Sequence, residues 1–246
     1  MRKLFTLIAS ATILISQNSY AENLKLVTGN DYAPFTDESI FNEGLVTDIV
    51  RKAYTRAGQD ITIEFMPWKR GERQVREGTA LATFPYAKTK DRENTYKFSN
   101  PLFVVENVPV VAPENANSIE SFQDMKGKMG CYPLGWELGV PQLDEMIANG
   151  EIEMQNPRSM DSCYRLLDRG RIDFIPADKP TAIIDAKKSL GSLDKVHFED
   201  FVNGQTPLYL MFSKEVSDKK LENFNEYLDS LKETGEYDKI VEKHMK

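Results

Sequence analysis

Few side chains in this sequence have the type and spacing that catalysis or metal binding needs, and none forms a recognisable catalytic motif. There is no nucleophile elbow, P-loop, dinucleotide-binding fingerprint or HExxH zinc motif. The two histidines, His197 and His244, have no cysteine nearby in the sequence, and we interpret both as structural or solvated. Catalysis by a triad or by a metal is therefore not expected, and we predict no metal ion and no other cofactor.

Arg92 is the charged residue most open to a binding role. A guanidinium offers two parallel N–H donors to a carboxylate. Arg92 also lies in the charged run 88–93, however, and such runs usually form a solvated surface. The residues alone favour the surface interpretation.

Composition and charge narrow the class of protein. Of 246 residues, 41% are apolar and 28% are charged, which is typical of a soluble globular chain and excludes disordered or coiled-coil interpretations. The 38 acidic residues outnumber the 31 basic ones, giving a formal charge of −7. Nucleic acid is therefore not an expected partner, because binding to phosphates depends on lysine and arginine.

The N-terminus has the pattern of a secretory signal peptide. Arg2 and Lys3 precede a mostly apolar stretch, 4–15, and Ser19 and Ala21 are small residues at the positions that precede a cleavage site. The apolar stretch is shorter than the roughly 20 residues that span a bilayer. We predict that residues 1–21 are removed by a cut after Ala21 and that the product lies outside the cytoplasm, where disulfides can form.

The rest of the chain repeats an order of helix, glycine and strand. Alternating residues predict strands at 24–28 and 61–65, and apolar residues at helical spacing predict an amphipathic helix over 44–57 that ends at Gly58. Helices near 68–77, 137–149 and 160–169, the last capped by Ser159, are each followed by a glycine and a short strand. This order predicts parallel βαβ units and an α/β fold.

Two long β-rich stretches interrupt this order, 102–112 and 206–212. We interpret them as crossover strands that join two lobes. The first lobe would comprise residues 22–110 plus 206–246 and would be discontinuous, with a second lobe, 111–205, inserted in it. The C-terminal part, 218–245, has a helical pattern interrupted near Gly235.

The only two cysteines, Cys131 and Cys163, both fall in the predicted second lobe. Adjacent βαβ elements can bring two cysteines within the Cα–Cα range of a disulfide, and export from the cytoplasm permits oxidation. They could instead be two buried small apolar residues. We expect the disulfide.

In series, several short motifs resemble the family 3 periplasmic solute-binding proteins, the polar-amino-acid receptors of ABC importers. The motifs are Asp31-Tyr32-Ala33-Pro34-Phe35, Gly44 with Asp48, Pro67-Trp68, Thr89-Lys90-Asp91-Arg92, Phe98-Ser99-Asn100-Pro101, Lys126-Gly127-Lys128, and Gly170-Arg171-Ile172-Asp173 with Asp178. The resemblance covers nearly all of the chain after the signal peptide. It implies a two-lobed periplasmic-binding-protein-like fold of type II, in which the two crossover strands form the hinge.

The resemblance also implies roles for individual residues. Arg92 matches the arginine that binds the α-carboxylate of the ligand, and Asp178 matches the acidic residue that receives the α-ammonium group. An N-cap ahead of Lys179-Pro180 is an equally natural role for Asp178. Aromatic and polar positions complete the expected ligand-binding set of Asp31, Tyr32, Phe35, Trp68, Arg70, Tyr86, Arg92, Trp136 and Asp178.

One segment departs from the family pattern. Amino-acid receptors usually carry small residues just before the arginine, but here Pro85 has no N–H and Tyr86 and Lys88 are bulky. Arg70 adds a cation close by. The chain therefore resembles a divergent branch, for which a small anionic or carboxylate-bearing solute is the expected ligand.

We predict a monomeric periplasmic solute-binding protein, not an enzyme, which closes by a hinge motion on a small polar solute such as an amino acid. Its partners would be this ligand and the membrane subunits of an ABC importer. Two alternatives stay open. One is an enzyme on the same scaffold, similar to a dehydratase, with Lys88, Glu137 and Asp178 as acid/base candidates. The other is a stand-alone ligand-sensing module.

Overall fold

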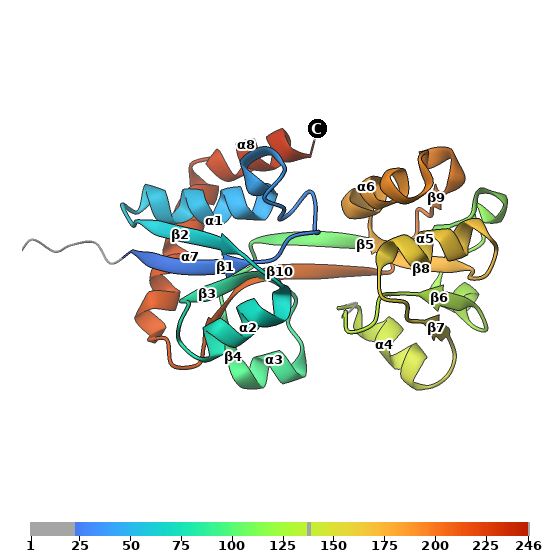
Figure 1. The fold of residues 1–246 in the computed structure, drawn as a ribbon, viewed down its shortest axis with the longest axis horizontal. Coiled ribbons are helices and arrows are strands. Elements are labelled where there is room, and N and C mark those ends of the chain that lie inside the picture. The colour runs from blue at the N-terminus through green and yellow to red at the C-terminus, as the bar shows by residue number, and fades with distance from the viewer. Residues whose placement is uncertain (1–22, 137–138, 246) are drawn as a thin grey trace, which may run out of the picture.

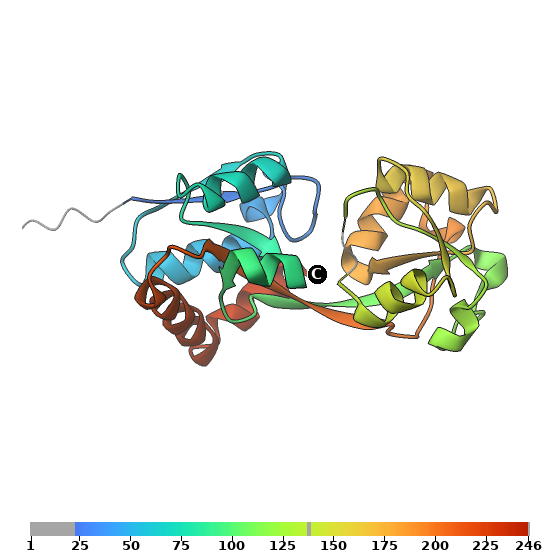
Figure 2. The ribbon, with the colours of Figure 1, turned by 90° about the horizontal axis from the view of Figure 1, so that it is seen from below.

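The computed structural model describes residues 23–136 and 139–245. The predicted signal peptide, 1–21, and the acid/base candidate Glu137 lie outside the described residues. Two lobes lie side by side, and two long strands, β5 and β10, run from one to the other (Figures 1 and 2). No described helix combines the length and the apolar character needed to cross a membrane.

We call the part built from both ends of the chain lobe 1. It contains β1 (Leu24–Thr28), α1 (Leu45–Arg56), β2 (Ile61–Phe65), α2 (Trp68–Arg76), β3 (Ala82–Tyr86), α3 (Lys90–Thr95), β4 (Tyr96–Phe98), α7 (Asp218–Glu233) and α8 (Glu236–His244). The second part, lobe 2, contains β6 (Met129–Cys131), α4 (Pro141–Ala148), β7 (Glu153–Gln155), α5 (Met160–Asp168), β8 (Phe174–Asp178), α6 (Lys179–Leu190) and β9 (His197–Phe198). The connecting strands are β5 (Phe103–Val111) and β10 (Gly204–Ser213).

The pairing of the strands shows how the lobes are joined. The order is β2-β1-β3-β10-β5-β8-β6-β7, with β4 added beside β10 and β9 beside β5. Within lobe 1, β1 pairs in parallel with β2 and β3, and within lobe 2, β6 pairs in parallel with β7 and β8. The connecting strands β5 and β10 pair with each other in antiparallel fashion. The predicted α/β class and the two crossover strands are therefore confirmed, whereas the lobe boundaries at 110/111 and 205/206 fall inside these strands and stay predictions.

Most elements lie where the sequence pattern predicts them. Strands β1 and β2 have the predicted bounds, and α1 occupies all but the ends of 44–57. Helix α5 begins after Ser159, whose hydroxyl accepts a hydrogen bond from the Ser162 N–H as an N-cap does. The helix expected at 137–149 is shorter, because α4 begins only at Pro141, whose fixed φ suits the first turn of a helix.

Each lobe has its own apolar core. In lobe 1, α1, α7 and α8 pack on one face of the sheet, around residues such as Leu26, Ile49 and Phe212, and α2 covers the other face. In lobe 2, α5 and α6 pack around Tyr164, while α4 packs around Phe174. Separate cores joined by two strands are the arrangement in which hinge closure around a ligand occurs.

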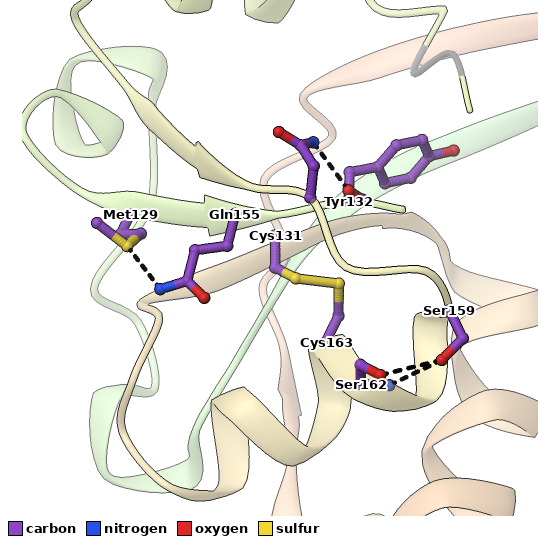
Figure 3. Close-up of a disulfide and its surroundings, with 8 residues drawn as sticks. Met129, Cys131, Tyr132, Gln155, Ser159, Ser162 and Cys163 are labelled. Carbon is purple, nitrogen blue, oxygen red and sulfur yellow. Dashed lines mark hydrogen bonds between the residues drawn. A yellow bond between two sulfur atoms is a disulfide. The ribbon is translucent and has the colours of Figure 1, made fainter. Parts of the chain in front are cut away.

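The predicted disulfide is present between Cys131 and Cys163, with a Cα–Cα distance of 5.6 Å (Figure 3). Cys131 is the last residue of β6, and Cys163 lies in the first turn of α5. The bond therefore fixes α5 to the end of β6. The chain that continues directly from Cys131 forms part of the site described next.

Candidate functional site

A cavity of about 460 Å³ lies between the lobes, where the carboxyl ends of several strands meet. Segments that follow β1, β2 and β3 line it from lobe 1, and segments that follow β6 and β8 line it from lobe 2. Ligands of open α/β sheets bind outside the carboxyl ends of the strands. The volume is in the range of ordinary small-molecule sites.

Seven of the nine residues expected to bind ligand line this cavity: Asp31, Tyr32, Trp68, Tyr86, Arg92, Trp136 and Asp178. The other two do not. Phe35 is completely buried in the core of lobe 1, where it packs against Phe103 and supports the Tyr32 ring at 4.9 Å. Arg70 is exposed on α2, two residues after Trp68, so its side chain leaves the helix in another direction.

Arg92 is held in place by several partners. Its Nη2 lies 3.2 Å from Glu72 Oε1, its Nη1 donates to the Ala87 carbonyl, and its guanidinium lies 4.8 Å from the centre of the Tyr86 ring. The Arg92 side chain is 17% exposed and that of Glu72 is 15% exposed. The guanidinium is thus positioned at the cavity wall, at the start of helix α3, where Thr89 caps the chain.

Three aromatic rings form a continuous wall on lobe 1. The Tyr86 ring lies 5.7 Å from Trp68, and Trp68 lies 6.5 Å from Tyr32, both in edge-on arrangements. The Tyr86 hydroxyl donates to the Trp68 carbonyl, which fixes the start of α2 to the end of β3. Gly29 makes room for this wall, because a Cβ there would lie only 2.2 Å from the Trp68 ring.

Lobe 2 contributes a second aromatic pair. The chain that leaves the disulfide-anchored end of β6 places Tyr132 and Trp136 at the cavity, with ring centres 6.0 Å apart. Trp136 is 44% exposed, so this ring lies at the rim of the cavity rather than in a core. A ligand between the lobes therefore has aromatic faces on both sides.

Asp178 is both an N-cap and a cavity residue. Its Oδ1 accepts the Thr181 N–H at 3.0 Å at the start of α6, which is the structural role left open by the sequence. Tyr32 of the opposite lobe also lines the cavity, and its hydroxyl acts on the Asp178 carboxyl. Burial raises the pKa of Asp178, and the hydroxyl and backbone N–H of Thr181, together with the Tyr32 hydroxyl, partly oppose that rise.

Two further carboxylates in the cavity were not expected from the sequence. Glu72 lies one helical turn after Trp68 on α2, and Asp185 lies one turn after Thr181 on α6. Burial, together with the charges of Asp178 and Asp31, raises the pKa of Asp185 to about 6, and the charge of Lys188 opposes this rise. Spacing of i, i+4 from Trp68, a predicted site residue, is the signal that would have identified Glu72; no predicted site residue stands in that relation to Asp185.

The connecting strands form the floor of the cavity. Asn107 from β5 donates to the Thr206 hydroxyl of β10 at 2.9 Å, and that hydroxyl donates to the Gly139 carbonyl at 3.2 Å. Val105 and Leu208 add apolar surface beside them. A ligand in the cavity would therefore contact both lobes and both strands that join them.

Two lobes with a ligand-sized cavity at their junction define a two-lobed α/β binding fold, of the periplasmic-binding-protein-like type II. Residues 24–246 match the model of the bacterial extracellular solute-binding proteins, family 3. The chain belongs to this family, whose members include amino-acid-binding proteins.

Proteins with different roles are similar to this chain. A probable histidine-binding protein of Campylobacter jejuni is 24% identical over 226 residues, which are 90% of this chain and 84% of that protein. Among solved structures, a histidine kinase sensor domain has a TM-score of 0.73 at 15% identity, covering 90% of this chain and 95% of its own. An ancestral amino-acid-binding protein, described as a precursor of cyclohexadienyl dehydratase, has a TM-score of 0.71 at 22% identity, covering 91% and 95%. These two structures support the fold and not a particular role.

Proposed function

We propose that this protein is a periplasmic receptor that captures a free amino acid between its lobes. Arg92 of lobe 1 would bind the α-carboxylate, and Asp178 of lobe 2 would bind the α-ammonium group. The observation that carries the proposal is that these two oppositely charged groups, one from each lobe, line the same cavity. A ligand that pairs with both favours the closed arrangement of the lobes.

The physical chemistry of both groups suits this role. A guanidinium binds a carboxylate through two parallel hydrogen bonds, and Glu72, Ala87 and the Tyr86 ring already hold Arg92 in position. Asp178 lies at the N-terminus of α6, where the helix dipole stabilises its charge. An ammonium group beside it would offset the cost of burying that charge.

An ABC importer is the proposed partner, and transport rather than catalysis is the proposed outcome. Of the acid/base candidates for an enzyme, Lys88 is not a cavity residue: its Nζ lies 4.5 Å from the centre of the Tyr209 ring. The probable histidine-binding relative favours a transport-type receptor, whereas the sensor domain and the dehydratase precursor share the fold. Uptake of a labelled ligand by cells with and without the protein would separate an importer from a sensor.

The direct test is calorimetric titration of the secreted protein with each of the twenty L-amino acids. We expect saturable binding of at least one, weakened at least tenfold in both Arg92→Lys and Asp178→Asn. Arg165→Lys and Asp161→Asn are matched controls, because these two side chains form an exposed pair on α5 outside the cavity. Absence of binding for all twenty, or equal affinity in all variants, would contradict the proposal.

A further inference from the structure

The connecting strand β10 changes partners where it enters lobe 1 (Figure 1). Its residues 204–208 pair with β5, whereas residues 209–213 pair with β3 and β4. The change falls between Leu208, which lines the cavity, and Tyr209. The way in which β10 is held in lobe 1 therefore helps to set the position of one lobe relative to the other.

The pairing of β10 with β3 is irregular at this point. Between the opposed residues Tyr209 and Tyr86 and the next opposed pair, β3 has two residues and β10 has one, Leu210. One of the two is Pro85, which has no N–H for the ladder and is typical of such bulges. The Leu210 N–H donates instead to the Ser99 hydroxyl at 3.1 Å. Because a bulge disrupts the ladder, side-chain contacts take a larger share in holding β10 here.

Lys88 supplies such a contact. Its Nζ lies 4.5 Å from the centre of the Tyr209 ring and 5.5 Å from the centre of the Phe98 ring, and the two rings meet edge-on at 5.7 Å. Phe98 belongs to β4, which pairs with β10, so one ammonium group contacts both strands. A cation over an aromatic face is attracted by the negative charge of that face.

The segment that carries Lys88, residues 87–92, also presents Arg92 to the cavity. The Arg92 guanidinium lies 4.8 Å from the centre of the Tyr86 ring, and Tyr86 is the partner of Tyr209 in the β3–β10 pairing. Its Nη1 donates to the carbonyl of Ala87, the residue before Lys88. Two cations of one segment thus lie over two paired rings, one on a strand of lobe 1 and one on a strand that joins the lobes.

We propose that Lys88 is a positioning residue, which fixes the connecting strand β10 to the segment that holds Arg92. This rests on the proposed function, in which Arg92 binds the ligand carboxylate, and it assigns a role to a side chain that does not line the cavity. A ligand bound by Arg92 and by lobe 2 would then act on β10 through a fixed segment. Without Lys88, β10 would be held less firmly beside the bulge, and the arrangement of the lobes would vary more.

The test measures the distance between the lobes in the empty protein, so it does not depend on which amino acid binds. Spin labels are attached to cysteines introduced at two exposed positions, Glu77 at the end of α2 and Arg169 at the end of α5. The native cysteines form the disulfide, so they do not react with the label. In Lys88→Gln the share of molecules at the wild-type distance, relative to all other distances, should fall about two- to fivefold, the effect of losing one exposed cation–π contact.

Conservative variants separate a positioning role from a general loss of packing. Lys88→Arg and Tyr209→Phe keep the cation and the ring, so both should keep the wild-type distances. Tyr209→Leu should resemble Lys88→Gln, and the double variant should change the distances no further, because both changes remove one contact. Lys243→Gln is the matched control: it removes a cation 4.3 Å from the Phe41 ring on α8, which packs on α1 and α7, and should leave the distances unchanged.

The outcomes also separate this inference from the proposed function. Wild-type distances in Lys88→Gln, or a change that Lys88→Arg does not reverse, would overturn the role of Lys88. A lower melting temperature with unchanged distances would make the contact merely structural and would overturn it as well. If an amino acid binds in the calorimetric titration while the distances fail to respond, the receptor function stands without this role. If no amino acid binds, the proposed function fails whatever the distances show.

Discussion

Replacing Arg92 with alanine should affect the empty and the liganded protein differently, and both effects follow from its contacts. In the empty protein the change removes the pair with Glu72 and the bond to the Ala87 carbonyl. A hydrogen bond between charged groups contributes about 1.5–3 kcal/mol, and the residual exposure of both side chains reduces the expected loss of unfolding free energy to about 1–2 kcal/mol. For a chain of this size that corresponds to a melting temperature lower by about 2–8 °C.

The effect on binding should be larger. A ligand carboxylate that has lost its guanidinium is left desolvated in a closed cavity, and breaking a buried pair of this kind costs about 3–5 kcal/mol, or more than a hundredfold in affinity. Arg92→Lys should recover little of this, since an ammonium group cannot form two parallel bonds. The assay is thermal unfolding with and without a saturating amino acid, because a ligand that binds only the folded state raises the melting temperature.

Glu72→Gln is the matched control for the stability effect. It removes the same ion pair but leaves Arg92, so the empty protein should lose a similar amount of stability while ligand binding remains. The reasoning would be refuted if Arg92→Ala kept the wild-type rise in melting temperature on ligand addition. It would also fail if Glu72→Gln, which keeps the guanidinium, abolished that rise.

Three other predictions concern charge, packing and the disulfide. The pKa of Asp185 in the folded protein, about 6, lies above its ordinary value of 3.8, so the folded state binds this proton more tightly than the unfolded state does. The stabilisation that results is complete below about pH 4 and is lost as the pH rises through 6. Asp185→Asn should therefore stabilise the empty protein by about 1–2 kcal/mol more at pH 8 than at pH 4, measured by urea unfolding; equal effects at both pH values would contradict this. Gly29→Ala should displace the Trp68 ring and change tryptophan fluorescence on its own, and an unaltered spectrum with normal ligand affinity would show that the close approach does not matter. Replacing both Cys131 and Cys163 with alanine removes a link across 32 positions and should cost about 3–4 kcal/mol of unfolding free energy, and an unchanged urea midpoint would contradict that.

The sequence predicted those parts of the fold that depend on local periodicity and on glycine. The alternation in 61–65 and the helical spacing in 44–57 identified β2 and α1 nearly to the residue, because each element buries one face against a core. The charged run 88–93 did not predict helix α3. That short helix has no apolar face and depends on the Thr89 cap and on the contacts of Arg92.

The site was predictable where a residue follows a strand directly and less so where it lies on a helix. Tyr32 and Trp68 lie within four residues of the carboxyl ends of the predicted strands 24–28 and 61–65, and Asp178 ends β8, so their position at the cavity follows from the topology. Asp185 lines the cavity because one face of α6 is turned toward it, and the sequence analysis raised only the start of α6, as an alternative role for Asp178, and not its extent. Phe35, adjacent to cavity residues in sequence, turns into the core because it packs against Phe103.

The measurement that most directly tests the central claim is native mass spectrometry of the protein, purified without unfolding, to weigh any ligand that co-purifies with it. The account predicts a bound molecule with the mass of an amino acid that is absent from Arg92→Ala and Asp178→Asn and present in the Asp161→Asn control. A bound molecule that lacks a carboxylate or an amino group, or one that both variants retain, would contradict it.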